Sequence, residues 1–99
     1  GGEIESPGGA VKADTLIRVA RNQFMTGNYA GAADAYEKAL RAGAPAGSTN
    51  QRLAQCFEKL GRTSEAIAAY GRAAKAFDAS GSASAAAACR QAIKVLQGG

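Results

Sequence analysis

The chain of 99 residues has no histidine, and this absence removes much of the common catalytic and metal chemistry. Without an imidazole there is no ordinary general base near pH 7, no Ser-His arrangement and no histidine-bearing zinc site. The eight acidic residues are well separated and form no carboxylate pair. We therefore expect a protein that is not an enzyme and that holds no cofactor and no metal.

Cysteine and long apolar runs are also scarce. The only cysteines, Cys56 and Cys89, form no CxxC motif and lie in segments with a helical pattern, whereas small disulfide-stabilised secreted domains have more cysteines in loop-rich sequence. No apolar run approaches the ~18 residues of a membrane span, and no signal-peptide pattern is present. These features predict two reduced helix cysteines, no direct membrane insertion and a cytoplasmic location.

A basic cluster is missing as well. The net charge is +4, but the 12 lysine and arginine residues are spread along the chain without a basic run. A dedicated nucleic-acid surface concentrates such residues on one patch. We expect no nucleic acid among the partners, and a nucleic-acid-binding helical domain is the least favoured alternative.

Large apolar side chains are few, which excludes most sheet architectures. The chain has 25 alanines but only 19 residues of valine, isoleucine, leucine, methionine, phenylalanine and tyrosine together. Strands favour β-branched and aromatic residues, whereas alanine has the highest helix propensity and lets helices approach closely. The composition predicts an all-α domain, and the alanine- and glycine-rich usage favours a bacterial source.

The pattern along the chain predicts a linker followed by five helices. Residues 1–11 hold four glycines and Pro7, a composition typical of a flexible linker or of added residues, so the domain is expected over 12–97. Asp14 is a plausible N-cap of the first helix, and Ser48 with Gln51 has the spacing of a capping box for the third. Apolar spacing predicts helices over about 13–26, 30–41, 48–60, 64–79 and 82–96.

What the chain does contain is an internal repeat. "GNYAGAADAYEKAL" (27–40) and "GRTSEAIAAYGRAA" (61–74) superpose at a shift of 34 residues. The shift places Gly27 on Gly61 and Tyr36 on Tyr70, and it also aligns several alanines. A 34-residue period with two helices per unit resembles the tetratricopeptide repeat. The second-helix halves match its Ala-x3-aromatic pattern closely, whereas Gln23 and Asn50 stand where that pattern has large side chains.

The resemblance implies an α-solenoid of two helix-turn-helix repeats, 13–46 and 47–80, with a capping helix over 81–97. It implies that Tyr36 and Tyr70 are buried between units. In that family the first helices line a concave groove that binds a peptide or a helix of a partner protein. Carried over by spacing, the groove residues here are Ile17, Arg21, Phe24, Gln51, Gln55, Lys59, Cys89 and Ile93.

The resemblance therefore implies a protein–protein interaction module, with Arg21 as its polar anchor and Ile17 and Phe24 as apolar contacts. The subfamily that clamps C-terminal carboxylates has Lys and Asn where this chain has Ile17 and Arg21, so that activity is not expected. Two alternatives stay open. The predicted groove residues can be core or solvated side chains, and the chain can be a self-association module that forms a homodimer or an array.

Overall fold

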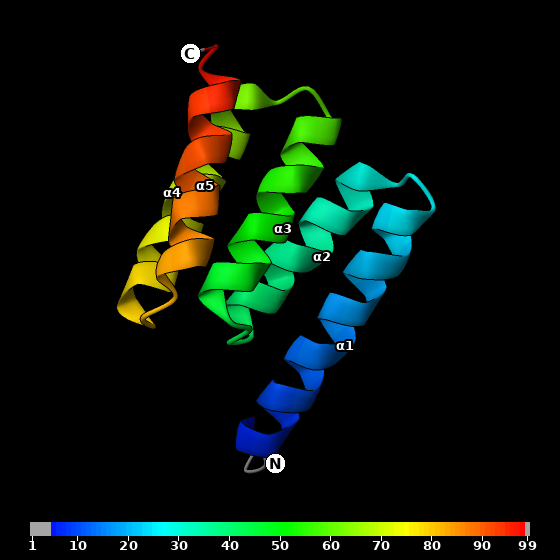
Figure 1. Ribbon diagram of the computed structural model, residues 1–99. Coiled ribbons are helices and arrows are strands. Elements are labelled where there is room, and N and C mark those ends of the chain that lie inside the picture. Colours follow the sequence, from blue (N-terminus) through cyan, green and yellow to red (C-terminus); the bar gives the residue numbers. More distant parts are fainter. Residues whose placement is uncertain (1–4, 99) are drawn as a thin grey trace.

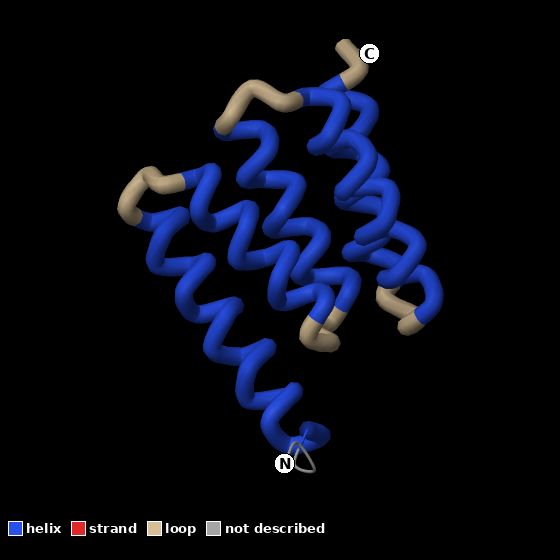
Figure 2. Tube along the Cα trace, turned by 180° about the vertical axis from the view of Figure 1, so that it is seen from behind, coloured by secondary structure: helices blue, strands red, loops and turns tan. Residues whose placement is uncertain are grey.

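The protein is built of α-helices joined by short turns. The computed structural model describes residues 5–98, with side chains from Lys12 onward. No strand occurs within this range, as Figure 2 shows. The prediction of an all-α domain with five helices is confirmed. In chain order they are α1 (Glu5–Met25), α2 (Tyr29–Arg41), α3 (Ala46–Lys59), α4 (Thr63–Ala79) and α5 (Ala83–Leu96) (Figure 1).

Each helix packs mainly against the helices that precede and follow it in the chain. Successive helices run in opposite directions, and in Figure 1 α5 lies in front of α4. Short connections between antiparallel neighbours are the ordinary result when amphipathic helices bury their apolar stripes in sequence order. The packing is therefore sequential from α1 to α5.

The four turns between helices share one geometry, which explains the repeated glycines. After α1, the Asn28 N–H donates to the Gln23 carbonyl oxygen at 2.8 Å; after α3, the Arg62 N–H donates to that of Phe57 at the same distance. Such six-to-one bonds define the Schellman ending of a helix, which needs a left-handed residue. That residue is a glycine with positive φ in every turn: Gly27, Gly43, Gly61 and Gly81.

One main core cluster extends from α1 to α5. Its largest members are Tyr36, Tyr70, Leu53 and Phe57, and the two tyrosines are 2% and 5% exposed. The prediction that both tyrosines are buried is confirmed. Small side chains fill the remaining space between the helices, which lets the backbones approach closely. The alanines with no exposed surface include Ala20, Ala32, Ala54, Ala66, Ala69 and Ala73.

The first helix begins earlier than the sequence predicts. Over residues 5–11 the structure has the first turns of α1 in place of the expected linker, and residues 1–4 lie outside the described residues. Extending an existing helix needs no new nucleation, and Pro7 is tolerated because an N–H in the first turn has no acceptor within the helix. Figures 1 and 2 show this end of α1 projecting beyond the other helices. Asp14 consequently lies inside α1 and is not its N-cap.

The third helix also begins earlier, at Ala46, so the capping box at Ser48 is wrong. Its N-cap is Pro45, which makes no side-chain capping bond. Gly47 in its first turn is buried, and a Cβ built on it would lie 2.7 Å from the ring of Phe77. The first turn of α3 therefore rests directly on α4.

Asn50, which departs from the repeat pattern, is accommodated inside the protein by hydrogen bonds. Its side chain is 5% exposed. Its Nδ2 donates to the Ala46 carbonyl oxygen at 2.9 Å, and its Oδ1 accepts from Arg72 Nε at 3.1 Å. Because both ends of the amide have a partner, the burial leaves no polar group unsatisfied there.

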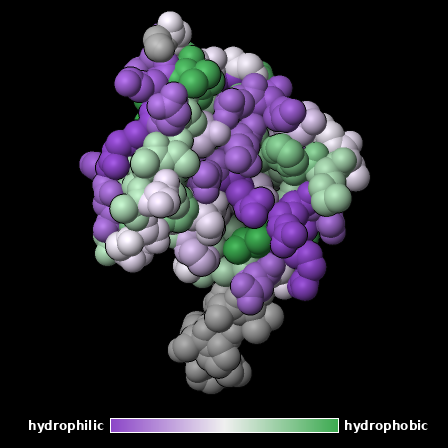
Figure 3. All heavy atoms as spheres, viewed as in Figure 1, coloured by the Kyte–Doolittle hydropathy of each residue, from purple (hydrophilic) through white to green (hydrophobic). Residues whose placement is uncertain are grey.

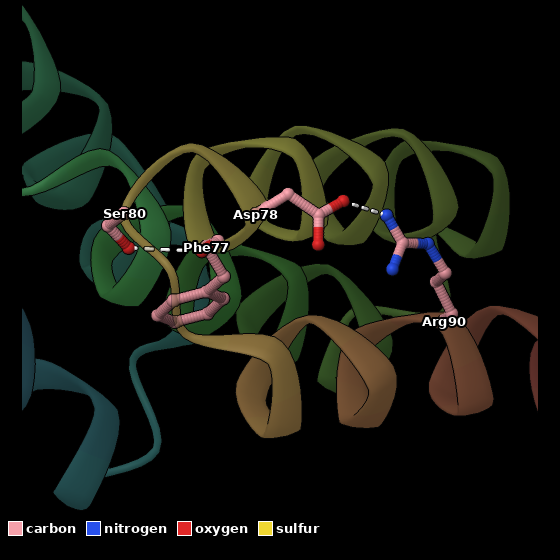
Figure 4. Close-up of polar contacts among 4 residues, drawn as sticks. All are labelled: Phe77, Asp78, Ser80 and Arg90. Atoms are coloured by element: carbon pink, nitrogen blue, oxygen red, sulfur yellow. Dashed lines mark hydrogen bonds and ion pairs between the residues drawn. The ribbon is translucent and has the colours of Figure 1, made fainter.

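The last helix is tied to α4 but is covered on one side only. The Arg90 guanidinium of α5 donates to the Asp78 carboxylate of α4 (Figure 4). At the end of α4, Ser80 Oγ donates to the Phe77 carbonyl oxygen at 3.1 Å. Of the side chains of α5 only Ala86 and Cys89 are buried. Its C-terminal end consequently keeps apolar surface in solvent.

Candidate functional site

A surface hollow of about 190 Å³ is lined by residues of α1, α2 and α3. We name it the α1–α3 hollow. Three of the predicted groove residues, Arg21, Phe24 and Gln55, come together in it. The complete lining is Arg21, Phe24 and Met25 from α1, Tyr36 from α2, and Arg52 and Gln55 from α3.

The α1–α3 hollow is positively charged. Arg21 and Arg52 are exposed, no carboxylate lines the hollow, and neither guanidinium forms an ion pair with an acidic residue of the described part of the chain. Two acids of α2 and α3 are engaged elsewhere. Asp34 pairs with Lys38 at 3.1 Å, and Glu58 accepts the hydroxyl of Tyr70. The two guanidinium groups thus have donors available for an external acceptor.

Tyr36 contributes a neutral phenol to this site. Burial raises the pKa of the Tyr36 hydroxyl above its usual value, while the positive charges of Arg52 and Arg21 act in the opposite direction. Both guanidinium groups are therefore close enough to influence the phenol. Because the net shift is upward, Tyr36 adds no negative charge to the hollow at neutral pH.

Phe24 connects the hollow to a second aromatic residue, Tyr29. The two ring centroids are 5.0 Å apart with the rings edge to face. Lys59 Nζ lies 5.9 Å from the centroid of the Tyr29 ring, within the range of a cation–π contact. Lys59, a predicted groove residue, is thereby placed next to Phe24 by way of Tyr29.

The other four predicted groove residues do not line the hollow. Ile17 and Ile93 are half-buried and pack against the core, and Gln51 is half-buried on α3. Cys89 has no exposed surface, which corrects its assignment to a groove. Its thiol belongs to the core cluster that also contains Tyr70.

Four residues of this region were not predicted as groove residues: Met25, Tyr29, Tyr36 and Arg52. Spacing along α3 selects Gln51 and Gln55, which are four apart, but Arg52 and Gln55 are three apart and share a helix face equally well. In the structure, Arg52 and Gln55 line the α1–α3 hollow, and Gln51 does not.

Two further hollows lie elsewhere on the surface. The larger, of about 400 Å³ between α1 and α2, is lined by the cations Lys12, Lys38 and Arg41 but by no aromatic residue, and Lys38 is paired with Asp34. The other contains acidic and basic side chains together, Glu37, Glu65 and Arg72. Within the described residues, no three His, Cys, Asp or Glu side chains gather as metal ligands. No helix of that range combines the length and apolar character needed to cross a bilayer.

The face shown in Figure 3 has no continuous apolar patch. Hydrophilic side chains occupy much of it, and hydrophobic ones gather in separate small areas. A broad apolar interface would show as one connected area, so contacts on this face are expected to combine polar and apolar groups. The α1–α3 hollow has that mixed composition.

Comparison with protein-family models and with curated proteins finds no match for this chain. The resemblance to tetratricopeptide repeats accordingly rests on the residues and their spacing. The function has to be argued from the site.

Proposed function

We propose that the protein is an interaction module that binds a peptide or a helical segment of a partner protein. In this proposal its helices form a short tetratricopeptide-like solenoid, with units over 13–46 and 47–80 and α5 as the closing helix. The 34-residue repeat and the sequential packing of the helices support this architecture. The proposal includes no enzymatic activity and places the protein in the cytoplasm.

The α1–α3 hollow is the observation that carries the proposal. It joins two guanidinium groups without acidic partners in the described residues to the side chain of Met25, which is 81% exposed. Arginine, methionine and aromatic residues are enriched at protein interfaces, and all three kinds meet here. The hollow is also open at the surface between two helices, where an extended segment or a helix can reach it.

Self-association is the second candidate, and the end of α5 is the observation that favours it. Val95 is 64% exposed, and its neighbours Ile93 and Leu96 are only half-buried. The last helix of a helical array exposes a face that a further unit would cover. A second copy of the chain could cover this face in a homodimer or an array.

A double substitution, Arg21→Glu with Gln55→Glu, separates the two candidates. Both side chains are exposed, so the melting temperature should stay unchanged. Under the groove proposal the variant no longer retrieves the partner that the parent chain retrieves from a native bacterial lysate. Arg18→Glu, exposed on α1 but outside the hollow, is the matched control and should retain that partner.

Partner binding that survives the double substitution in a folded protein would remove the hollow as the binding site. Sedimentation of the parent chain tests the second candidate independently. A dimer that dissociates on Val95→Lys would favour self-association, and a monomer would exclude it.

A further inference from the structure

We propose that the α1–α3 hollow recognises a carboxylate side chain in the partner segment, held by Arg21 and Arg52 from two different helices, with a large apolar residue beside it. This inference rests on the proposed function, and it adds the chemistry of the ligand. The segment it defines contains glutamate or aspartate next to a large apolar side chain.

The size of the hollow limits what can enter it. Pockets for complete small-molecule ligands enclose roughly 300–1,000 Å³. The hollow has about 190 Å³. That space suits one side chain of a longer segment, with the rest of the segment lying along α1 and α3.

The charges of the hollow favour an anionic ligand. Arg21 and Arg52 bring two positive charges, and the remaining lining residues bring no negative one. Each guanidinium presents several N–H donors in a plane, which match the two oxygens of a carboxylate. Neither guanidinium takes part in an ion pair within the described part of the chain, so their donors stay available to a ligand.

The apolar part of the lining indicates which kind of residue should lie beside the carboxylate in the partner segment. Phe24 is half-buried and held against Tyr29, so it forms a fixed wall. Met25 is largely exposed at the edge of the hollow and can cover an apolar side chain of the partner. A carboxylate without an apolar neighbour would leave this surface in water.

A nucleic-acid ligand fits these observations less well. Backbone recognition uses basic residues that follow successive phosphates, whereas here two arginines converge on one small hollow. A single charged group with an apolar neighbour is the chemistry of a peptide side chain.

Selection from a library of random 12-residue peptides tests the inference. The enriched peptides should contain glutamate or aspartate beside leucine, phenylalanine or methionine. For one such peptide, glutamate→glutamine should weaken binding roughly tenfold, and so should Arg21→Gln or Arg52→Gln in the protein. Arg18→Gln removes the same charge outside the hollow and should change the affinity less than twofold.

A thermodynamic cycle makes the assignment specific. With Arg52→Gln in the protein, changing the peptide glutamate to glutamine should have little further effect, because the contact is already absent. Full additivity of the two changes would overturn the inference. A phosphoseryl version that binds more than tenfold tighter than the glutamyl peptide would also overturn it, in favour of a phosphate site.

Failure of the inference can be distinguished from failure of the proposed function. Enriched peptides without an acidic residue, bound equally by Arg21→Gln and Arg52→Gln but lost on Met25→Ala, would overturn the carboxylate and leave the groove in place. If no enriched peptide depends on any residue of the hollow, the groove itself is wrong.

Discussion

Tyr36 and Tyr70 occupy the same position in the two halves of the chain, 34 residues apart, but their hydroxyl groups have different surroundings. The Tyr70 hydroxyl donates a hydrogen bond to the Glu58 carboxylate. Burial, and to a smaller extent this hydrogen bond, raise the pKa of Tyr70 well above the usual value. Tyr36 instead lies beneath Arg21 and Arg52 in the α1–α3 hollow. The buried tyrosine of the second half thus forms a hydrogen bond within the protein, whereas the equivalent tyrosine of the first half lines a charged hollow at the surface.

The repeat register shows which residues make this difference. Glu58 corresponds to Phe24, and the positions that correspond to Arg21 and Arg52 are Gln55 and Ala86. The second half therefore has the acid and lacks the two arginines. The two halves share the buried tyrosine, and a few unshared positions change the charge around its hydroxyl group.

The largest expected effect comes from removing either buried tyrosine. Tyr70→Ala and Tyr36→Ala should each lower the free energy of unfolding by about 3 kcal/mol, since both leave a large cavity in the core. In a small domain that loss can unfold the protein. Thermal melting followed by circular dichroism measures it, and a melting temperature within one or two degrees of the parent would contradict the shared packing role.

Alkaline pH should destabilise the protein, with Cys56 as a main contributor. Burial raises the pKa of the Cys56 thiol from 9.0 to about 11, so the folded state favours the neutral thiol. The contribution is complete below pH 9 and is lost as pH rises toward 11, on the order of 2 kcal/mol. Buried tyrosines with raised pKa values add to the loss above pH 10.

Urea unfolding at several pH values measures this dependence, and Cys56→Ala is the comparison. The variant is less stable throughout because it loses packing, but its stability should fall less steeply between pH 9 and pH 11. Equal slopes for parent and variant would rule out Cys56 as the titrating group.

Gly47→Ala tests another difference between the halves. The corresponding residue in the first half is Ala13, whose side chain is buried without conflict. At Gly47 an added Cβ would meet the Phe77 ring at 2.7 Å, so we expect a loss of roughly 1–3 kcal/mol in the free energy of unfolding.

Gly71→Ala is the matched control for this change. A Cβ at Gly71 has no atom within 4 Å, and alanine favours a helix over glycine by about 0.5–1 kcal/mol. The control should therefore be more stable than the parent in urea unfolding. Two variants of equal stability would mean that α3 does not rest on Phe77.

The smallest expected effect concerns the hydroxyl groups themselves. Tyr70→Phe removes the bond to Glu58 and should lower the free energy of unfolding by about 1 kcal/mol, a typical value for one hydrogen bond. Tyr36→Phe should lower it less, because no carboxylate accepts its hydroxyl. Urea unfolding of the two variants compares them directly, and a larger loss for Tyr36→Phe would reverse the assigned roles.

Much of the fold could be predicted because it depends on local signals. The turn glycines and the apolar spacing placed the starts of α2, α4 and α5 within one residue of Tyr29, Thr63 and Ala83. The starts of α1 and α3 were missed for different reasons. The first is an extension of an already formed helix. The second was placed at Ser48 from a capping-box spacing that the helix does not use, because its N-cap is Pro45.

The site was predicted in part for a similar reason. Spacing along α1 found Arg21 and Phe24, because residues three apart share a helix face. On α3 the choice between Gln51 and Arg52 depends on how that helix is turned against α1, which no local pattern contains. Cys89 was misassigned because the extent of its burial depends on how closely α5 packs on its neighbours.

The difference between the two halves is tested most directly by NMR of the chain with 13Cζ-labelled tyrosine. The probe is the glutamate-containing peptide selected from the library, added in steps to the protein at constant pH. We expect the Tyr36 signal to shift in proportion to bound peptide, because its phenol lies beneath the two arginines of the hollow, and the Tyr70 signal to stay in place. A saturable shift of Tyr70 with an unchanged Tyr36 would contradict the account.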